Sequence, residues 1–219
     1  QELIDYHLVG ELRNIINSFS TQNVDSIVSS FASNTALNML NARYVIYDPQ
    51  QQPLFNPYTL GNAWFVSGYS FVDNADQEID ALNNTEVYKT AVIDKKFEAD
   101  LAGLTIVPDS TARGELLEYK PNYLKYKSSA QTEQLAVFSE IYFPNDWEAF
   151  VDGKPTPHFR ADWTLRAMRV PAGEHEIVFK FEPKEYYVSR TIATASSGIL
   201  LLMLIGMIVM GFVKKEDKE

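Results

Sequence analysis

The sequence GEHEIVFKFEPKEYYVSRTIATASSGILLLMLIGMIVMGFVKK, residues 173–215, joins an alternating strand-like pattern to a long apolar run. Its second half, from Thr191 to Val213, contains no charged residue. At about 1.5 Å per residue this stretch makes a helix of roughly 34 Å, which exceeds the hydrocarbon core of a bilayer at about 30 Å. A helix in the core of a soluble protein is usually shorter and keeps a polar face. The stretch therefore predicts one transmembrane helix over 191–213.

The first half of the same stretch alternates as a β-strand does. Ile177, Phe179 and Phe181 point to one face, and the residues between them point to the other. The dipeptide Asp152-Gly153 is a strong hairpin signal, because a type I′ turn needs positive φ at both central residues. Strands at such short spacing predict an antiparallel β-sandwich over 114–184. Its other strands are expected at 114–120, 122–128, 134–143, 146–153 and 164–171.

Helices and strands are mixed in the first 113 residues. A helix is expected over 2–19, where apolar residues recur at helical spacing at Ile4, Leu8, Leu12, Ile15 and Phe19. Shorter helices are expected at 24–31 and 34–40, the second capped by Asn34 or Thr35. The following pattern predicts a strand at 43–48, a polar loop at 50–57, one strand at 62–72 with a bulge at Gly68, a helix at 73–84 capped by Asp73 or Asn74, and a strand at 88–94.

These patterns predict an α+β fold, in which N-terminal helices and mixed strands lead into an antiparallel β-sandwich, followed by one transmembrane α-helix. The expected segments are a helical segment (1–42), an α+β segment (43–113), the β-sandwich region (114–184), the transmembrane helix (191–213) and a cytoplasmic tail (214–219). The patterns leave open whether 43–113 forms a domain of its own or adds strands to the sandwich.

Charge and composition exclude several classes of function. A net charge of -10 argues against a nucleic-acid partner, because no basic surface is present to neutralise phosphates. The absence of cysteine rules out disulfides and thiolate metal sites. The three histidines, His7, His158 and His175, lack the spacing of metal ligands. We expect no metal and no cofactor.

The residues beside the apolar stretch predict its orientation. Lys214 and Lys215 follow it, while Arg190 precedes it, which weakly favours a cytoplasmic C-terminus under the positive-inside rule. Tyr186 and Tyr187 lie where aromatic rings favour the membrane interface. The folded part is then extracytoplasmic, and the bilayer is its first expected partner. Because the chain lacks both an initial methionine and an export signal, we expect it to be part of a longer protein with earlier membrane segments.

Aromatic residues make up 13% of the chain, and the tryptophans lie near turns or strand ends. An indole ring offers a flat apolar face and one hydrogen-bond donor, which suits stacking on a sugar. Acidic residues directly precede two of the tryptophans and could accept sugar hydroxyls. The alternative is that these rings belong to the core, an interpretation favoured for Trp147 and left open for Trp163. The candidate glycan-binding residues are Trp163, Asp162, Trp147, Asp146 and Trp64.

Two runs of sequence carry a resemblance to a known family. The run VFSEIYFPNDWEAFVDGKPTPHFRADWTLRAMRVPAGEHEIVFKFEPKEYY (137–187) and the earlier run LNMLNARYVIYD (37–48), followed by NPYTLGNAWFV (56–66), resemble the C-terminal region of bacterial YfhO-like membrane proteins. The resemblance implies a large polytopic protein of the cytoplasmic membrane, similar to glycosyltransferases that use lipid-linked sugars. The catalytic acid of such enzymes usually lies in an early extracytoplasmic loop. This chain does not contain that region, so no catalytic residue is assigned here.

Two hypotheses follow. The first is a membrane-anchored extracytoplasmic accessory domain of a YfhO-like protein, which assists sugar transfer from a lipid-linked donor to a cell-envelope glycan or polymer. The second is a purely structural domain that packs on the extracytoplasmic loops of the parent protein and has no ligand of its own. Both expect other transmembrane helices as partners, because Ala193 and Ser197 form a small-xxx-small pair that lets a second helix approach closely.

Overall fold

The computed structural model describes residues 2–21 and 23–216, with the side chains of Tyr6, Thr21 and 209–216 left aside. The chain divides into two compact units, Gln1–Phe181 and Glu182–Glu219. The first unit contains helices and sheets, and the second consists chiefly of one long helix.

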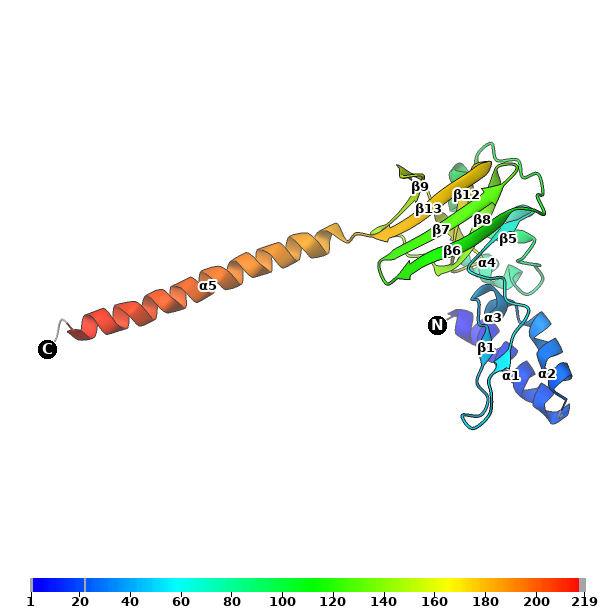
Figure 1. Ribbon diagram of the computed structural model, residues 1–219, viewed down its shortest axis with the longest axis horizontal. Helices are drawn as coiled ribbons and strands as arrows, with labels where there is room; N and C mark the ends of the chain where they lie inside the picture. Colours follow the sequence, from blue (N-terminus) through cyan, green and yellow to red (C-terminus); the bar gives the residue numbers. More distant parts are fainter. Residues whose placement is uncertain (1, 22, 217–219) are drawn as a thin grey trace. The chain divides into compact units, whose positions relative to one another are not determined.

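Two antiparallel sheets form the larger part of the first unit (Figure 1). The five-stranded sheet has the order β10-β9-β13-β7-β6, with β6 Arg113–Lys120, β7 Tyr123–Ala130, β9 Trp147–Val151, β10 Lys154–Pro155 and β13 Gly173–Phe181. The four-stranded sheet has the order β11-β12-β8-β3, with β3 Ala63–Val66, β8 Gln134–Ile141, β11 Phe159–Ala161 and β12 Leu165–Val170. The predicted α+β class is confirmed.

The core of the sandwich is an aromatic cluster between the sheets. Tyr126 and Phe179 come from the five-stranded sheet and Phe138 from the four-stranded sheet, and each is at most 1% exposed. Their ring centroids lie 5.0 to 6.1 Å apart in edge-to-face arrangements, the geometry that aromatic quadrupoles favour. Ile177 and Phe179 are buried on this face, as the alternation in β13 predicts, while Phe181 is half-buried.

Turn chemistry places the strand ends. Asp152 and Gly153 connect β9 to β10 with φ values of +49° and +76°, so the hairpin signal is confirmed. Strands β10 and β11 were not predicted, because runs of two or three residues are too short to show alternation.

The expected single strand over 62–72 is wrong. It forms two strands, β3 and β4 (Gly68–Val72), which belong to different sheets. The backbone N–H groups of Ser67 and Gly68 both donate to the carbonyl of Lys89, and this contact separates the two strands. β3 pairs with β8 in the sandwich, so the segment 43–113 does contribute a strand to it. β4 pairs in parallel with β5 (Thr90–Asp94), whose apolar residues are all buried.

The helix α4 (Ala75–Ala81) connects β4 to β5. Asn74 is its N-cap, and its side-chain oxygen accepts the N–H of Gln77 at 2.9 Å, so Asn74 rather than Asp73 caps the helix. The 3-10 segment η4 (Lys95–Leu101) follows β5.

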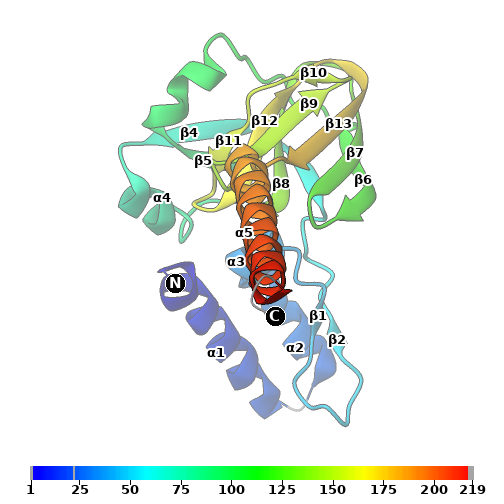
Figure 2. The ribbon, with the colours of Figure 1, turned by 90° about the vertical axis from the view of Figure 1, so that its left-hand side faces the viewer.

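Short helices make up the N-terminal segment, and they group with a small hairpin beside the sandwich (Figures 1 and 2). Their bounds are η1 Ile4–Leu8, α1 Val9–Ser18, η2 Phe19–Thr21, α2 Val24–Ser30, η3 Phe31–Ser33 and α3 Thr35–Met39. The hairpin consists of β1 (Tyr44–Val45) and β2 (Leu54–Phe55). The strand predicted over 43–48 is therefore only two residues long, and the predicted loop over 50–57 contains β2.

The apolar stripe predicted for the first helix is only partly buried. His7, Glu11 and Ile15 face the protein, whereas Leu12 is 43% exposed. The carboxylate of Glu11 accepts the N–H groups of Ala36 and Leu37 at 2.7 and 2.9 Å, and so caps α3 from another helix. Asn34 stands at the N-cap position of α3 but makes no side-chain cap bond. The first helix therefore presents the buried carboxylate of Glu11 to α3, which an apolar pattern cannot reveal.

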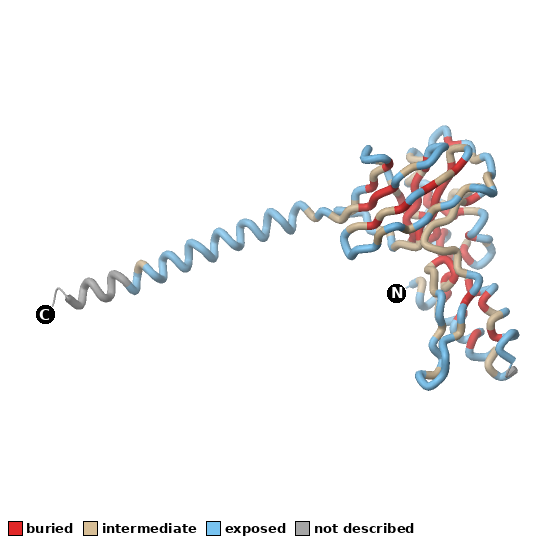
Figure 3. Tube along the Cα trace, in the orientation of Figure 1, coloured by how far each residue is buried: buried red, intermediate tan, exposed pale blue. Residues whose placement is uncertain are grey.

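The second unit contains α5 (Lys184–Glu216), which begins directly after Pro183. From Lys184 to Ile208 it is long and apolar enough to cross a membrane, and it is exposed along nearly all of this length (Figure 3). The hydroxyls of Thr191, Thr194, Ser196 and Ser197 donate to carbonyls four residues earlier in the helix. These bonds satisfy within the helix the polar groups that lipid cannot.

Candidate functional site

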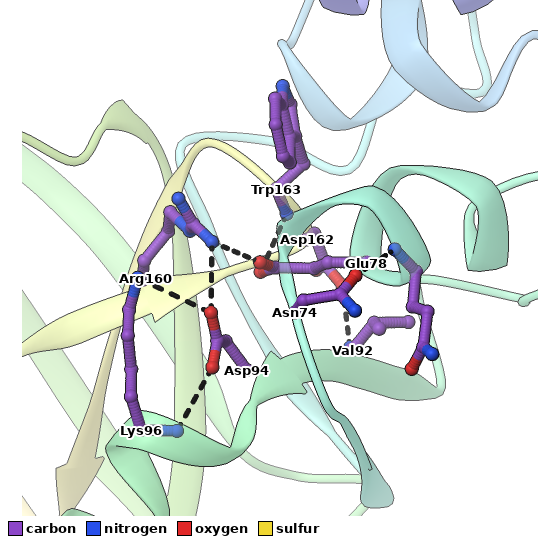
Figure 4. Close-up of polar contacts among 9 residues, drawn as sticks. Asn74, Glu78, Val92, Asp94, Lys96, Arg160, Asp162 and Trp163 are labelled. Atoms are coloured by element: carbon purple, nitrogen blue, oxygen red, sulfur yellow. Dashed lines mark hydrogen bonds and ion pairs between the residues drawn. The ribbon is translucent and has the colours of Figure 1, made fainter.

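A group of ionisable side chains, here called the buried charge cluster, lies where α4 meets β11 and the turn between β11 and β12 (Figure 4). It consists of Glu78, Asp94, Arg160 and Asp162. Glu78 and Asp162 have no exposed surface, and Asp94 is 7% exposed. Carboxylates are rarely buried unless they are paired or hydrogen-bonded. The partners of each carboxyl group therefore determine whether it is ionised or protonated.

Glu78 is held by two donors. The guanidinium of Arg160 donates to one carboxylate oxygen, and the backbone N–H of Trp163 donates to the other at 3.0 Å. Burial raises the pKa of Glu78 above its ordinary value, and the charge of Arg160 and the Trp163 N–H oppose this rise. These two bonds join α4 to strand β11 and to the turn that follows it, across more than 80 residues of sequence.

Asp94 ends β5 and lies near two cations. Its carboxylate is 3.3 Å from the Lys96 ammonium and 3.6 Å from the Arg160 guanidinium. Burial raises the pKa of Asp94, but the N–H and ammonium of Lys96 together with Arg160 outweigh it and bring the pKa below its ordinary value. Asp94 therefore stays ionised and shares Arg160 with Glu78.

Asp162 exchanges two hydrogen bonds with the backbone of Val92, much as paired residues of adjacent strands do. Its N–H donates to the Val92 carbonyl, and its Oδ1 accepts the Val92 N–H, both at 2.8 Å. Burial raises the pKa of Asp162 to about 8, and the nearby charge of Glu78 adds to the rise. The second oxygen, Oδ2, has no hydrogen-bond partner among the described residues. Asp162 is thus a neutral acid at pH 7 that fixes β5 against the sandwich.

The turn that carries these bonds is strained. Asp162 and Trp163 have φ values of +50° and +69°, in the left-handed region that non-glycine residues seldom adopt. Trp163 also places its ring over Arg160, 5.3 Å from the guanidinium carbon, and Figure 4 shows that ring directed away from the carboxylates. The surrounding bonds hold a conformation that the chain alone would disfavour.

The candidate glycan-binding residues predicted from the sequence do not form one site, because they contact different neighbours. Asp162 has no exposed surface to offer a sugar hydroxyl. Trp163 is half-buried over Arg160. Trp64 is half-buried on β3, where its indole N–H donates to the Val87 carbonyl at 3.1 Å. The buried charge cluster brings Asp162 and Trp163 together, but the other candidates lie with different neighbours.

Trp147 packs against a buried arginine. The Arg166 guanidinium lies 3.9 Å from the Trp147 ring centroid, and Phe181 stacks at 5.5 Å. Arg166 is 3% exposed and donates to the Ile141 carbonyl at 3.0 Å. These contacts fit the core interpretation of Trp147, since cation–π contacts strengthen when desolvated. Asp146, next to it, is exposed with φ of +65°.

The predicted interface residues Tyr186, Tyr187 and Arg190 lie exposed on the first turns of α5. The side chains of Lys214 and Lys215 lie outside the described residues. Within the part of the chain that the structure describes, no group of His, Asp or Glu could hold a metal ion.

Sequence reasoning missed Glu78, Arg160 and Arg166. A signal for Glu78 was present, because it shares one helix face with Ala75, Ile79 and Leu82 at spacings of three and four. An acid on an apolar face indicates a buried partner. Arg166 likewise shares its strand face with Met168 and Val170.

Comparisons with family models, with curated proteins and with solved structures find no match for this chain.

The neutral state of Asp162 predicts a pH-dependent stability. Between pH 3.8 and about 8 the unfolded chain releases a proton that the folded chain retains, so the free energy of unfolding falls as pH rises through this window. Asp162→Asn keeps a neutral side chain that tolerates positive φ. Urea unfolding of both proteins at about pH 5 and about pH 8 should show the variant gaining stability relative to the wild type at the higher pH.

The comparison between the two proteins removes the contribution of titrating groups that do not interact with Asp162, such as Glu11. A stability difference between wild type and Asp162→Asn that stays constant over this pH range would contradict a protonated Asp162.

Proposed function

We propose that this chain is a membrane-anchored accessory domain on the extracytoplasmic side of a bacterial cytoplasmic membrane. In this proposal it belongs to a larger, YfhO-like membrane protein and assists sugar transfer from a lipid-linked donor to a cell-envelope glycan or polymer. The bilayer and the other membrane helices of that protein are its partners.

The observation that carries the anchoring is α5. Its apolar part, Lys184–Ile208, is long enough to cross a membrane and has none of its apolar window buried, and exposed apolar area of this size is unfavourable in water. Immersion of α5 in lipid removes that cost. Its hydroxyl groups do not oppose immersion, because they donate to carbonyls of the same helix.

The proposed side of the membrane and the proposed substrate class are both inferred from the sequence. The lysines after the apolar stretch favour a cytoplasmic C-terminus. The resemblance of 37–66 and 137–187 to YfhO-like proteins brings sugar transfer into the proposal. The buried acids fit an accessory role, because Glu78 and Asp162 support the fold and have no surface for a substrate.

Residues 1–219 contain no cysteine, so a cysteine introduced into them tests sidedness directly, with the unchanged parent protein as the labelling background. Gln51→Cys lies in the exposed loop between β1 and β2, and Lys218→Cys lies in the tail. In cells that express the native gene with either change, a membrane-impermeant maleimide should label position 51 in intact cells and position 218 only after permeabilisation. The reverse pattern, or extraction of the protein by alkaline carbonate, would contradict the proposal.

A second candidate function is favoured by an apolar surface. The N-terminal helices and the β1–β2 hairpin expose large apolar side chains, with Ile16 at 65% and Ile46 at 70%. Large exposed apolar areas commonly mark protein contacts. In this alternative the domain is purely structural, and the exposed apolar side chains of this segment pack on extracytoplasmic loops of the parent protein; they are Val9, Leu12, Ile16, Val24, Tyr44, Ile46 and Phe55.

The structural alternative predicts that a charge on this surface lowers the abundance of the native membrane protein. Ile16→Glu and Ile46→Glu should each reduce its steady-state level several-fold, because unpacked membrane proteins are degraded. Ile141→Glu is the matched control, since Ile141 is 54% exposed at the end of β8. Quantitative blotting that finds all three variants at equal levels would remove this candidate.

A further inference from the structure

A cavity of about 430 Å³ lies between the N-terminal helices and the loop that follows α4. Thr35 and Asn38 come from α3, Tyr58 from the loop after β2, and Thr85, Glu86 and Tyr88 from the loop between α4 and β5. Its volume lies within the range of small-ligand sites, about 300–1,000 Å³. None of the five candidate residues named from the sequence lines it.

Two phenol rings supply apolar faces at this cavity. Tyr58 is 40% exposed and Tyr88 is 48% exposed, and they come from separate loops. The Lys89 ammonium lies over one face of Tyr88, 4.9 Å from the ring centroid, which leaves the other face of Tyr88 and the ring of Tyr58 for a ligand. A ring face beside polar groups suits the apolar face of a sugar. The lining of the cavity thus contains two aromatic rings from separate loops.

A fixed carboxylate stands beside these rings. Glu86 accepts the Tyr88 hydroxyl at 2.9 Å and the Lys89 ammonium at 2.8 Å. These bonds, that of Lys89 first, lower the pKa of Glu86, so the group is an ionised acceptor at neutral pH. Because Lys89 balances its charge, an uncharged ligand with hydroxyl donors fits better than an organic cation or an anion.

Buried amides hold the cavity in shape. The Asn56 amide donates to the Asn38 side-chain oxygen at 2.8 Å, and its own oxygen accepts the Tyr58 N–H at 3.0 Å. The Leu60 N–H donates to the Asn38 carbonyl at 3.1 Å. The backbone at Tyr58 is therefore positioned before any ligand binds, which reduces the entropic cost of binding.

We propose that this cavity binds one uncharged sugar unit of a glycan, with Tyr58 and Tyr88 against the ring faces and Glu86 accepting sugar hydroxyls. The assignment of that sugar to a cell-envelope glycan rests on the proposed function, whereas sugar binding itself does not.

The test uses the full chain in a polyoxyethylene detergent, which has neither a sugar nor a choline headgroup. Saturation-transfer NMR is recorded with methyl β-glucoside, methyl β-galactoside and diacetylchitobiose as neutral probes, and with choline and glucuronate as charged probes. At least one neutral sugar should bind. Tyr58→Leu and Tyr88→Leu should each weaken it about tenfold, equivalent to about 1.4 kcal/mol, while Tyr58→Phe should keep affinity within about twofold because the ring remains.

Tyr119→Ala is the matched control, since Tyr119 is 65% exposed on β6 outside the cavity. Absence of binding by all three neutral sugars, binding of choline or glucuronate alone, or equal loss in Tyr119→Ala and Tyr58→Leu would each overturn the inference. Maleimide labelling of position 51 separates the two proposals. If the chain binds a sugar but position 51 is labelled only from the cytoplasmic side, sugar binding in the cavity is supported and the proposed function is rejected. If position 51 is labelled in intact cells but no sugar binds, the proposed function is supported and sugar binding in the cavity is rejected.

Discussion

The ion pair between Glu78 and Arg160 connects the parts of the first unit. It fastens α4 to strand β11 of the sandwich. From the same helix, the carbonyl of Ile79 is 3.0 Å from the His7 ring nitrogen and so links the N-terminal helices. The loop that leaves α4 forms one wall of the cavity around Tyr88. The positions of the helical segment and of the cavity wall therefore depend on how α4 is held.

This connection is electrostatically expensive. Three carboxylates, those of Glu78, Asp94 and Asp162, are buried near Arg160, and each would be costly if ionised without a partner. The protein limits the cost by keeping Asp162 neutral and by adding Lys96 beside Asp94. Buried ion pairs often add little net stability compared with apolar residues. In this chain the cluster specifies one orientation of α4, because both carboxylate oxygens of Glu78 have a defined donor across the joint.

Features repeated along the sequence were predictable, whereas features set by a single distant partner were not. The long strands of the sandwich, the Asp152-Gly153 turn and the apolar span followed from alternation, turn chemistry and length. The stripe of the first helix failed because Glu11 is buried to cap α3, a contact 25 residues away. The strand over 62–72 failed because the carbonyl of Lys89 captures the chain at Ser67. For the candidate site, aromatic type alone could not separate Trp147, which packs on Arg166, from rings that remain open at the surface, such as Tyr58.

The buried acids support the fold, and an open aromatic cavity is the proposed site of ligand contact. Both depend on Glu78 and Arg160 acting as one connection between α4 and the sandwich. A double-mutant cycle measures this claim directly. Urea unfolding of the full chain should show Arg160→Met losing about 3–5 kcal/mol, because it leaves the buried Glu78 carboxylate without its cation, and Glu78→Met losing less, because Arg160 keeps Asp94 as a partner. The double variant, which leaves neither charge, should lose clearly less than the sum. Additive losses would show that the two side chains contribute independently and would contradict the account.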